Sequence, residues 1–236
     1  MRTTQSIGRI IGALMLAQMI GGILVNFVLL APVTTPPGFL VNAATHSLQL
    51  GFTVLIGLMT GALSVAIAIT ALPVFRRYSY AMALWLLALG VVSLALAVVE
   101  NSAVMSMLSL SQAYAKANAV DAALFETLRV VVASSRNWAH YTHVLVGGAT
   151  FLVFYSVLYR FALIPRALAA IGVIAVMLQL TTVTMPFFGY RIVMLMLMPM
   201  GLSHLALALW LMVKGFEEGR HPFRAVSLDT ELSRQS

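Results

Sequence analysis

The residues of this sequence that could do chemistry begin with one acid and one stripe of basic side chains. Arg136, His140 and His143 follow one another at spacings of four and three, which places them on one face of a helix. If Glu100 faces that stripe, a carboxylate, a guanidinium and two imidazoles converge in one cavity. Carboxylate and imidazole ligands suit zinc or non-haem iron, and a Glu–His pair can also transfer protons or act as general acid and base.

His46 and Gln49, three residues apart, are expected at the same end of a neighbouring helix. Two histidines on different helices could also hold a haem. The candidate ligand-binding residues are therefore Glu100, His140, His143, His46, Arg136 and Gln49. The candidate metal ligands are Glu100, His140, His143 and His46. The cofactor stays unknown, with zinc, iron and haem as the alternatives.

A purely structural interpretation of the same residues stays open. Glu100 could form an ion pair with Arg136, and the histidines could be hydrogen-bonded near lipid headgroups. An H-x-x-H spacing occurs in many helices and has low specificity. The residues alone do not decide between these interpretations.

A second polar group lies near the middle of three apolar stretches: Gln18, Gln179 and His204. These side chains could form hydrogen bonds between helices, or they could continue a polar pathway from the first group to the membrane centre. Pro199 precedes His204 by five residues, so we expect a bend in that helix.

The composition requires a lipid environment for most of the chain. Of 236 residues, 61% are hydrophobic and 9% are charged, whereas a soluble domain has about a quarter charged residues. The net charge of +7 is explained by basic residues at helix ends, so binding of nucleic acid is not expected. The absence of cysteine excludes disulfides and thiolate metal sites.

The hydropathy pattern predicts an all-α membrane bundle of six spans, each with the roughly 20 apolar residues that a bilayer requires. The expected spans are 7–31, 44–74, 79–112, 137–161, 166–185 and 191–216. Val120, Leu124, Leu128 and Val131 recur at helical spacing, which predicts an interfacial amphipathic helix over 119–134, on the outer side between the third and fourth spans. Residues 217–236 form a polar tail.

Basic residues predict the orientation, since Lys and Arg are enriched in cytoplasmic loops. Ten of them are expected on one side: Arg2, Arg9, Arg76, Arg77, Arg160, Arg166, Lys214, Arg220, Arg224 and Arg234. Four are expected on the other: Lys116, Arg129, Arg136 and Arg191. This asymmetry places both termini in the cytoplasm and the Glu100 group at the outer boundary.

Three functional hypotheses fit these observations. The leading one is a membrane protein that binds a small apolar or amphipathic ligand in the bundle, with Glu100 and the histidines at its outer mouth. The second is a metal- or haem-dependent membrane enzyme that uses the same residues. The third is a structural subunit of a homo-oligomer or membrane complex, in which glycine pairs such as Gly8–Gly12 and Gly57–Gly61 pack against other helices. No phosphate-binding loop, H-E-x-x-H or G-x-S-x-G motif is present.

Two stretches resemble a known family. Residues 6–14, SIGRIIGAL, resemble the A-R-x-x-G-x-x-Y-L start of the bacterial domain-of-unknown-function family 4386. Residues 158–172, LYRFALIPRALAAIG, are similar to its Y-R-S-G-x-L-P-R-x-L-G-x-L segment. The chain has Ala162 where the family often has glycine, and Gly148-Ala149 where relatives can carry histidine. The resemblance, over about 200 residues, implies a bacterial inner-membrane bundle, and it carries over no catalytic residue.

Overall fold

The computed structural model describes residues 3–117 and 121–217, and every regular element in these two ranges is a helix. The α-helices are α1 Thr4–Ile23, α2 Ala31–Thr34, α3 Phe39–Thr45, α4 Ser47–Phe75, α5 Tyr80–Tyr114, α6 Ala122–Arg160, α7 Arg166–Thr184 and α8 Met198–Lys214. Three shorter helical turns accompany them: a π-helical turn at Leu24–Leu29 and 3-10 turns at Met185–Phe188 and Met194–Met196.

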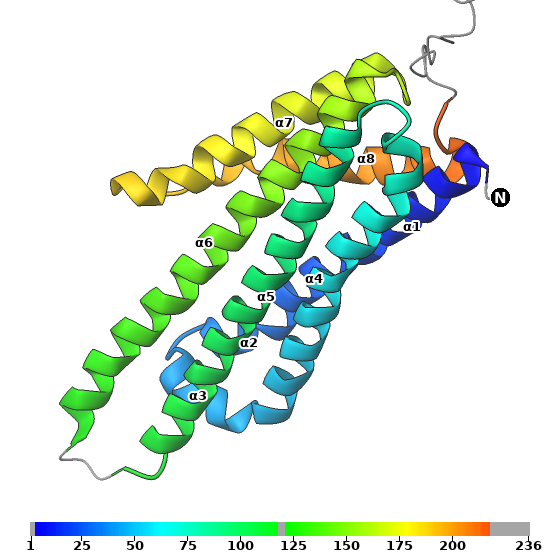
Figure 1. Cartoon of the computed structure of the whole chain (residues 1–236). Coiled ribbons are helices and arrows are strands. Elements are labelled where there is room, and N and C mark those ends of the chain that lie inside the picture. Colours follow the sequence, from blue (N-terminus) through cyan, green and yellow to red (C-terminus); the bar gives the residue numbers. More distant parts are fainter. Residues whose placement is uncertain (1–2, 118–120, 218–236) are drawn as a thin grey trace, which may run out of the picture.

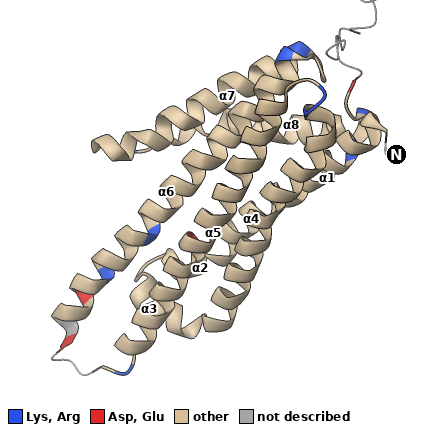
Figure 2. Ribbon diagram, viewed as in Figure 1, with Lys and Arg blue, Asp and Glu red and all other residues tan. Residues whose placement is uncertain are grey.

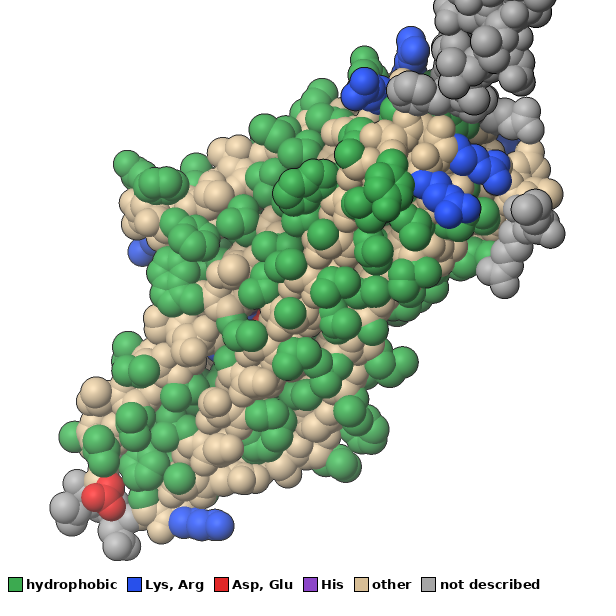
Figure 3. Space-filling model, in the orientation of Figure 1, with side chains coloured by type: hydrophobic (Ala, Val, Ile, Leu, Met, Phe, Trp, Pro, Cys, Tyr) green, Lys and Arg blue, Asp and Glu red, His purple; other side chains and the backbone are tan. Residues whose placement is uncertain are grey.

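Six of the helical segments are long and apolar enough to cross a membrane, as expected from the sequence. They are Thr4–Thr34, Ser47–Phe75, Tyr80–Tyr114, Ala123–Arg160, Arg166–Phe188 and Met194–Lys214. Large apolar side chains such as Phe27, Leu48 and Met59 are exposed, and hydrophobic atoms cover the visible face from end to end (Figure 3). Such a surface is stable only in lipid. The chain is therefore a multi-pass membrane protein.

The six long helices pack as a closed ring. In order of contact, α1 packs on α4, α4 on α5, α5 on α6, α6 on α7, α7 on α8, and α8 again on α1 (Figure 1). Gly12 lies at the closing contact, where an added Cβ would come within 2.6 Å of the Ala208 carbonyl oxygen. Small residues permit such close approach of helices in lipid, where packing drives association.

The two ends of the ring differ. We call the end where α1 begins and α8 ends the terminal end, and the end where α5 connects to α6 the hairpin end. Buried aromatic rings close the terminal half: Phe75 packs on Phe154 at 5.4 Å and on Phe216 at 6.0 Å between ring centroids. At the hairpin end α3 packs on α5, and α5 and α6 extend past α7 and α8 (Figure 1).

Basic residues cluster at the terminal end (Figure 2). The described ones there are Arg9, Arg76, Arg77, Arg160, Arg166 and Lys214. The hairpin end carries Lys116, Arg129, Arg136 and Arg191. The groups are those expected from the sequence, apart from Arg2, Arg220, Arg224 and Arg234, which lie outside the described residues, as does the polar tail beyond Glu217.

The expected interfacial helix over 119–134 is not a separate element. Its described part is the first section of α6, which continues without a break from Ala122 to Arg160. The sequence contains no proline or glycine between Ala122 and Gly147, so nothing interrupts the helix. Leu124, Leu128 and Val131 are exposed on this extension, beyond the main ring.

The last span also differs from its expected bounds of 191–216. The α-helix begins only at Met198, with Pro199 in its first turn, so the expected proline bend inside the helix is replaced by a helix start. Proline is favoured there because the first helical N–H groups have no partner within the helix. The residues between α7 and α8 lie at the hairpin end and include the 3-10 turn at Met194–Met196.

Candidate functional site: a carboxylate–imidazole cluster beside a central cavity

Glu100 accepts hydrogen bonds from the stripe on α6. The Nδ1 atom of His140 lies 2.7 Å from Oε1, and Nδ1 of His143 lies 2.8 Å from Oε2. The Arg136 guanidinium lies 3.5 Å from Oε1 and completes an ion pair. The spacing of four and three brings all three basic side chains to one carboxylate, because α5 and α6 pack along their lengths. We call these four residues the Glu100 cluster.

The Glu100 cluster is mostly enclosed by protein. The Glu100 side chain is 13% exposed and that of Arg136 is 17% exposed. Removing charges from water is costly, and here the cost is offset by an opposite charge and by hydrogen bonds to both carboxylate oxygens. One acid and one guanidinium balance, so the cluster is neutral overall when both imidazoles are neutral.

A cavity of about 160 Å³ adjoins the Glu100 cluster, and we call it the hairpin-end cavity. Glu100, His140 and His143 line one side of it, and Asn26 and Gly22 line the other. Asn26 belongs to the π-helical turn at Leu24–Leu29, a distortion that often marks functional sites. Gly57 lies on the wall beside Asn101, whose Oδ1 would be 2.5 Å from an added Cβ.

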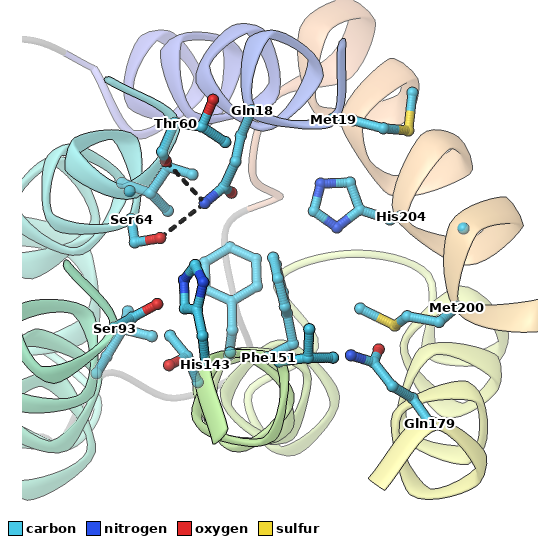
Figure 4. Close-up of a pocket in the computed structure, with 18 residues that line it drawn as sticks. Gln18, Met19, Thr60, Ser64, Ser93, His143, Phe151, Gln179, Met200 and His204 are labelled. Atoms are coloured by element: carbon cyan, nitrogen blue, oxygen red, sulfur yellow. Dashed lines mark hydrogen bonds between the residues drawn. The ribbon is translucent and has the colours of Figure 1, made fainter. Parts of the chain in front are cut away.

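A second cavity, of about 290 Å³, lies inside the ring and is lined by residues of all six long helices. We call it the central cavity. Figure 4 shows labelled side chains extending into it from every side of the ring. Its polar lining includes the three residues predicted for the membrane centre, Gln18, Gln179 and His204, while most of the remaining wall is apolar.

Hydrogen bonds fix two of these three polar side chains. Gln18 Nε2 donates to Ser64 Oγ at 2.7 Å and to the Thr60 carbonyl oxygen at 3.4 Å (Figure 4). His204 Nε2 lies 3.3 Å from the Met15 carbonyl oxygen, and its ring packs edge-on against Phe151 with 4.7 Å between centroids. Gln179 makes no hydrogen bond within the described ranges and borders the cavity. The Oε1 atom of Gln18 is buried without a partner among the described atoms.

The two cavities adjoin each other. Thr60, His143 and Val144 line both of them. His143 thus contacts Glu100 through Nδ1 and also borders the central cavity, where it extends from α6 (Figure 4). A continuous lining therefore connects the Glu100 cluster with the polar residues of the membrane centre.

The structure does not bring His46 and Gln49 to the Glu100 cluster. His46 ends α3, where its Nδ1 lies 2.8 Å from the Asn42 carbonyl oxygen. Gln49 Nε2 donates to the Leu29 carbonyl oxygen at 2.7 Å and so joins α4 to the π-helical turn. Neither residue lines either cavity. Both side chains stabilise the local backbone.

The described residues do not form a preformed metal site. Within residues 3–117 and 121–217, no group of three or more His, Asp or Glu side chains is arranged to hold a metal ion. The Nδ1 atoms of His140 and His143 are directed at carboxylate oxygens at hydrogen-bonding distance, so only their Nε2 atoms are free to bind a ligand.

Sequence reasoning missed several polar residues of the cavity walls: Asn26, Thr53, Thr60, Ser64, Ser93 and Thr150. Serine and asparagine are common in membrane helices, so their identity alone gave no signal. Gln18 contacts the hydroxyl of Ser64 but the backbone carbonyl of Thr60, a group that every residue carries, so the identity of Thr60 could not have indicated this contact.

The chain belongs to the family described as domain of unknown function DUF4386, whose model matches residues 10–215. The family expected from the two short stretches is thereby confirmed. No curated protein and no solved structure matches the chain.

Proposed function

We propose that this DUF4386 protein binds a small apolar or amphipathic ligand in its central cavity, with the Glu100 cluster orienting the polar group of that ligand at the outer mouth. The observation that carries the proposal is the position of the cavity, which is lined by all six long helices and adjoins the Glu100 cluster through His143. Small-molecule sites are typically apolar spaces with a few fixed polar groups. A volume of about 290 Å³ lies at the lower end of their range, so the ligand is small.

The arrangement of the imidazoles supports a binding role in addition to a structural one. An ion pair with Arg136 would be enough to neutralise Glu100. Two imidazoles are nevertheless fixed on the same carboxylate, and their Nε2 atoms have no partner within the described part of the chain. A fixed imidazole with one free nitrogen beside a cavity can bind a ligand without reorganisation.

The proposed setting is a bacterial inner membrane, with both chain ends in the cytoplasm and the hairpin end outside. The excess of arginine and lysine at the terminal end supports this orientation. A ligand would then reach the Glu100 cluster from the outer side or from the outer leaflet. The aromatic packing of Phe75, Phe154 and Phe216 closes the opposite half of the ring.

A cavity-filling substitution tests the proposal. An added Cβ at Gly147 would meet no atom within 4 Å, and Gly147 lines the central cavity, so Gly147→Leu fills the space without displacing the backbone. Gly51→Leu is the matched control, because Gly51 is equally unobstructed but lines neither cavity. We expect undecan-2-ol to raise the melting temperature of the wild type and of Gly51→Leu, and to leave that of Gly147→Leu unchanged.

Native mass spectrometry of the same three proteins gives an independent measurement. The wild type and Gly51→Leu should retain one bound undecan-2-ol, and Gly147→Leu none. Equal retention by all three proteins would refute binding in the central cavity. Binding in the central cavity would also be refuted if none of the three proteins retained the alcohol.

A further inference from the structure

Two histidines on the central cavity are held by protein acceptors. His143 Nδ1 lies 2.8 Å from a carboxylate oxygen of Glu100, and His204 Nε2 lies 3.3 Å from the Met15 carbonyl oxygen. An ionised carboxylate and a carbonyl can only accept hydrogen bonds, so these two ring nitrogens must donate. In a neutral imidazole the other nitrogen is then an acceptor. Both histidines therefore present an acceptor to their remaining surroundings.

The charges of the Glu100 cluster already balance without a proton on either imidazole. Arg136 already compensates Glu100, so a proton added to His143 would give the Glu100 cluster a net positive charge inside the bundle. His204 is 8% exposed, and its hydrogen-bonding partner is a backbone carbonyl, with no acid beside it. An uncompensated charge at either place is costly in a medium of low dielectric constant.

The free nitrogens have no partner within the described chain. Neither His143 Nε2 nor His204 Nδ1 makes a hydrogen bond there, and both residues line the central cavity. Figure 4 shows the two rings extending into the same space from α6 and α8. Gln18 Oε1 adds a third acceptor on this wall, since its amide nitrogen already donates to Ser64 and Thr60.

We propose that the central cavity selects an amphiphile whose polar group donates a hydrogen bond, an alcohol or a phenol, over its carbonyl counterpart. The inference rests on the proposed function, since it specifies the ligand of that same cavity. At the Glu100 cluster a hydroxyl donates to His143 Nε2, whereas a ketone there would bury an acceptor against an acceptor. A site whose buried polar groups are left unpaired rejects the wrong ligand strongly.

The other polar groups of the cavity do not oppose this selection. Ser64, Ser93 and Gln179 can each donate or accept, so they can rotate to suit either ligand. Only the imidazoles have their tautomers fixed by a second partner. The preference for an alcohol over a ketone should therefore depend on the hydrogen bond by which Glu100 fixes the tautomer of His143.

The matched pair undecan-2-ol and undecan-2-one tests the inference, because the two compounds share a carbon skeleton. Dissociation constants come from thermal-shift titrations of the full chain in detergent. We expect the wild type to bind the alcohol about tenfold more tightly than the ketone, as the loss of one buried hydrogen bond predicts.

Glu100→Gln should reduce this preference, because Glu100 fixes the tautomer of His143 and does not contact His204. The amide oxygen is expected to replace Oε1, which accepts from both Arg136 and His140, so the amide nitrogen faces His143. That nitrogen donates to His143 Nδ1, and Nε2 then carries the proton and can donate to either compound. The ratio of dissociation constants should fall from about ten toward one, and any remaining preference is set by His204 Nδ1, which the substitution leaves unchanged. Glu126→Gln is the control, since Glu126 forms an exposed pair with Arg129 and lies far along α6 from both cavities.

The outcomes separate the two proposals. Equal binding of alcohol and ketone by the wild type, or tighter binding of the ketone, would overturn the donor selectivity and leave binding in the cavity intact. Binding of neither compound would overturn both. If Glu100→Gln cannot be purified, His143→Leu removes the acceptor nitrogen and should likewise reduce the preference; an unchanged tenfold ratio in either variant would contradict the inference.

Discussion

Glu100 and Arg136 show how one charge pair controls the stability of a buried polar cluster. Each is less than one-fifth exposed, so neither can be rehydrated if the other is removed. The free energy lost on breaking such a pair exceeds what the pair contributes, because the remaining charge stays in a poorly solvated site.

We therefore predict that Glu100→Leu lowers the free energy of unfolding by about 3–5 kcal/mol. The double variant Glu100→Leu/Arg136→Leu should recover a large part of that loss, since no unpaired charge remains. Unfolding in mixed micelles, followed by circular dichroism, measures both. Glu126→Leu should change stability by less than about 1 kcal/mol, because its partner Arg129 is exposed. A double variant less stable than the single one would contradict this account.

The sequence predicted the residues that contact Glu100 from α6 better than it predicted which residues of other helices lie beside them. Arg136, His140 and His143 share one helix, so their common face follows from helix geometry alone. His46 and Gln49 belong to another helix, and their depth in the membrane says nothing about the direction in which they point. The break at His46, between α3 and α4, turns them toward Asn42 and Leu29.

At the scale of elements, the end of α6 carries a conformation that suits glycine better than the residue present. Ala162 has φ of 51°, a left-handed conformation that costs an L-amino acid about 1–2 kcal/mol. Ala162 follows Phe161, the C-cap of α6, in the turn that leads into α7.

We predict that Ala162→Gly stabilises the protein by about 0.5–1 kcal/mol, the relief of strain being reduced by the greater freedom of glycine in the unfolded chain. Ala88→Gly, at an exposed position inside α5, should stabilise nothing and serves as the control. Melting temperatures in one detergent compare the two. Destabilisation by Ala162→Gly would show that the turn tolerates alanine without strain.

The number of spans followed from hydropathy, but the way in which helices begin and join did not. The extension 122–134 has an amphipathic pattern that fits either a separate interfacial helix or a continuation of α6. Only the absence of a breaking residue favours continuity, and that signal is weaker than the pattern. Pro199 led us to expect a bend inside a helix, whereas the structure has a helix start there. A proline suits the first turn of a helix as well as a kink.

At the scale of the whole molecule, orientation determines which compartment reaches the Glu100 cluster. The chain has no cysteine, so single cysteines can report on each end without background. Ala115 is exposed at the hairpin end, and Glu217 is exposed at the terminal end.

We predict that a membrane-impermeant maleimide labels Ala115→Cys in intact cells and leaves Glu217→Cys unlabelled until the membrane is opened. Mass spectrometry of the purified variants quantifies the label. The reverse pattern would place the Glu100 cluster on the cytoplasmic side and reverse the proposed route of ligand entry.

The closing contact between α1 and α8 has a consequence for how the protein is made. Translation delivers α1 to the membrane first and α8 last, yet Gly12 of α1 packs against the backbone of α8 at Ala208. Until the ribosome has released the final helix, α1 has only one of its two neighbours, and the space that becomes the cavity stays open on that side. Assembly is therefore completed only after synthesis ends, and a nascent chain that stalls before residue 198 would present an incomplete bundle to membrane proteases.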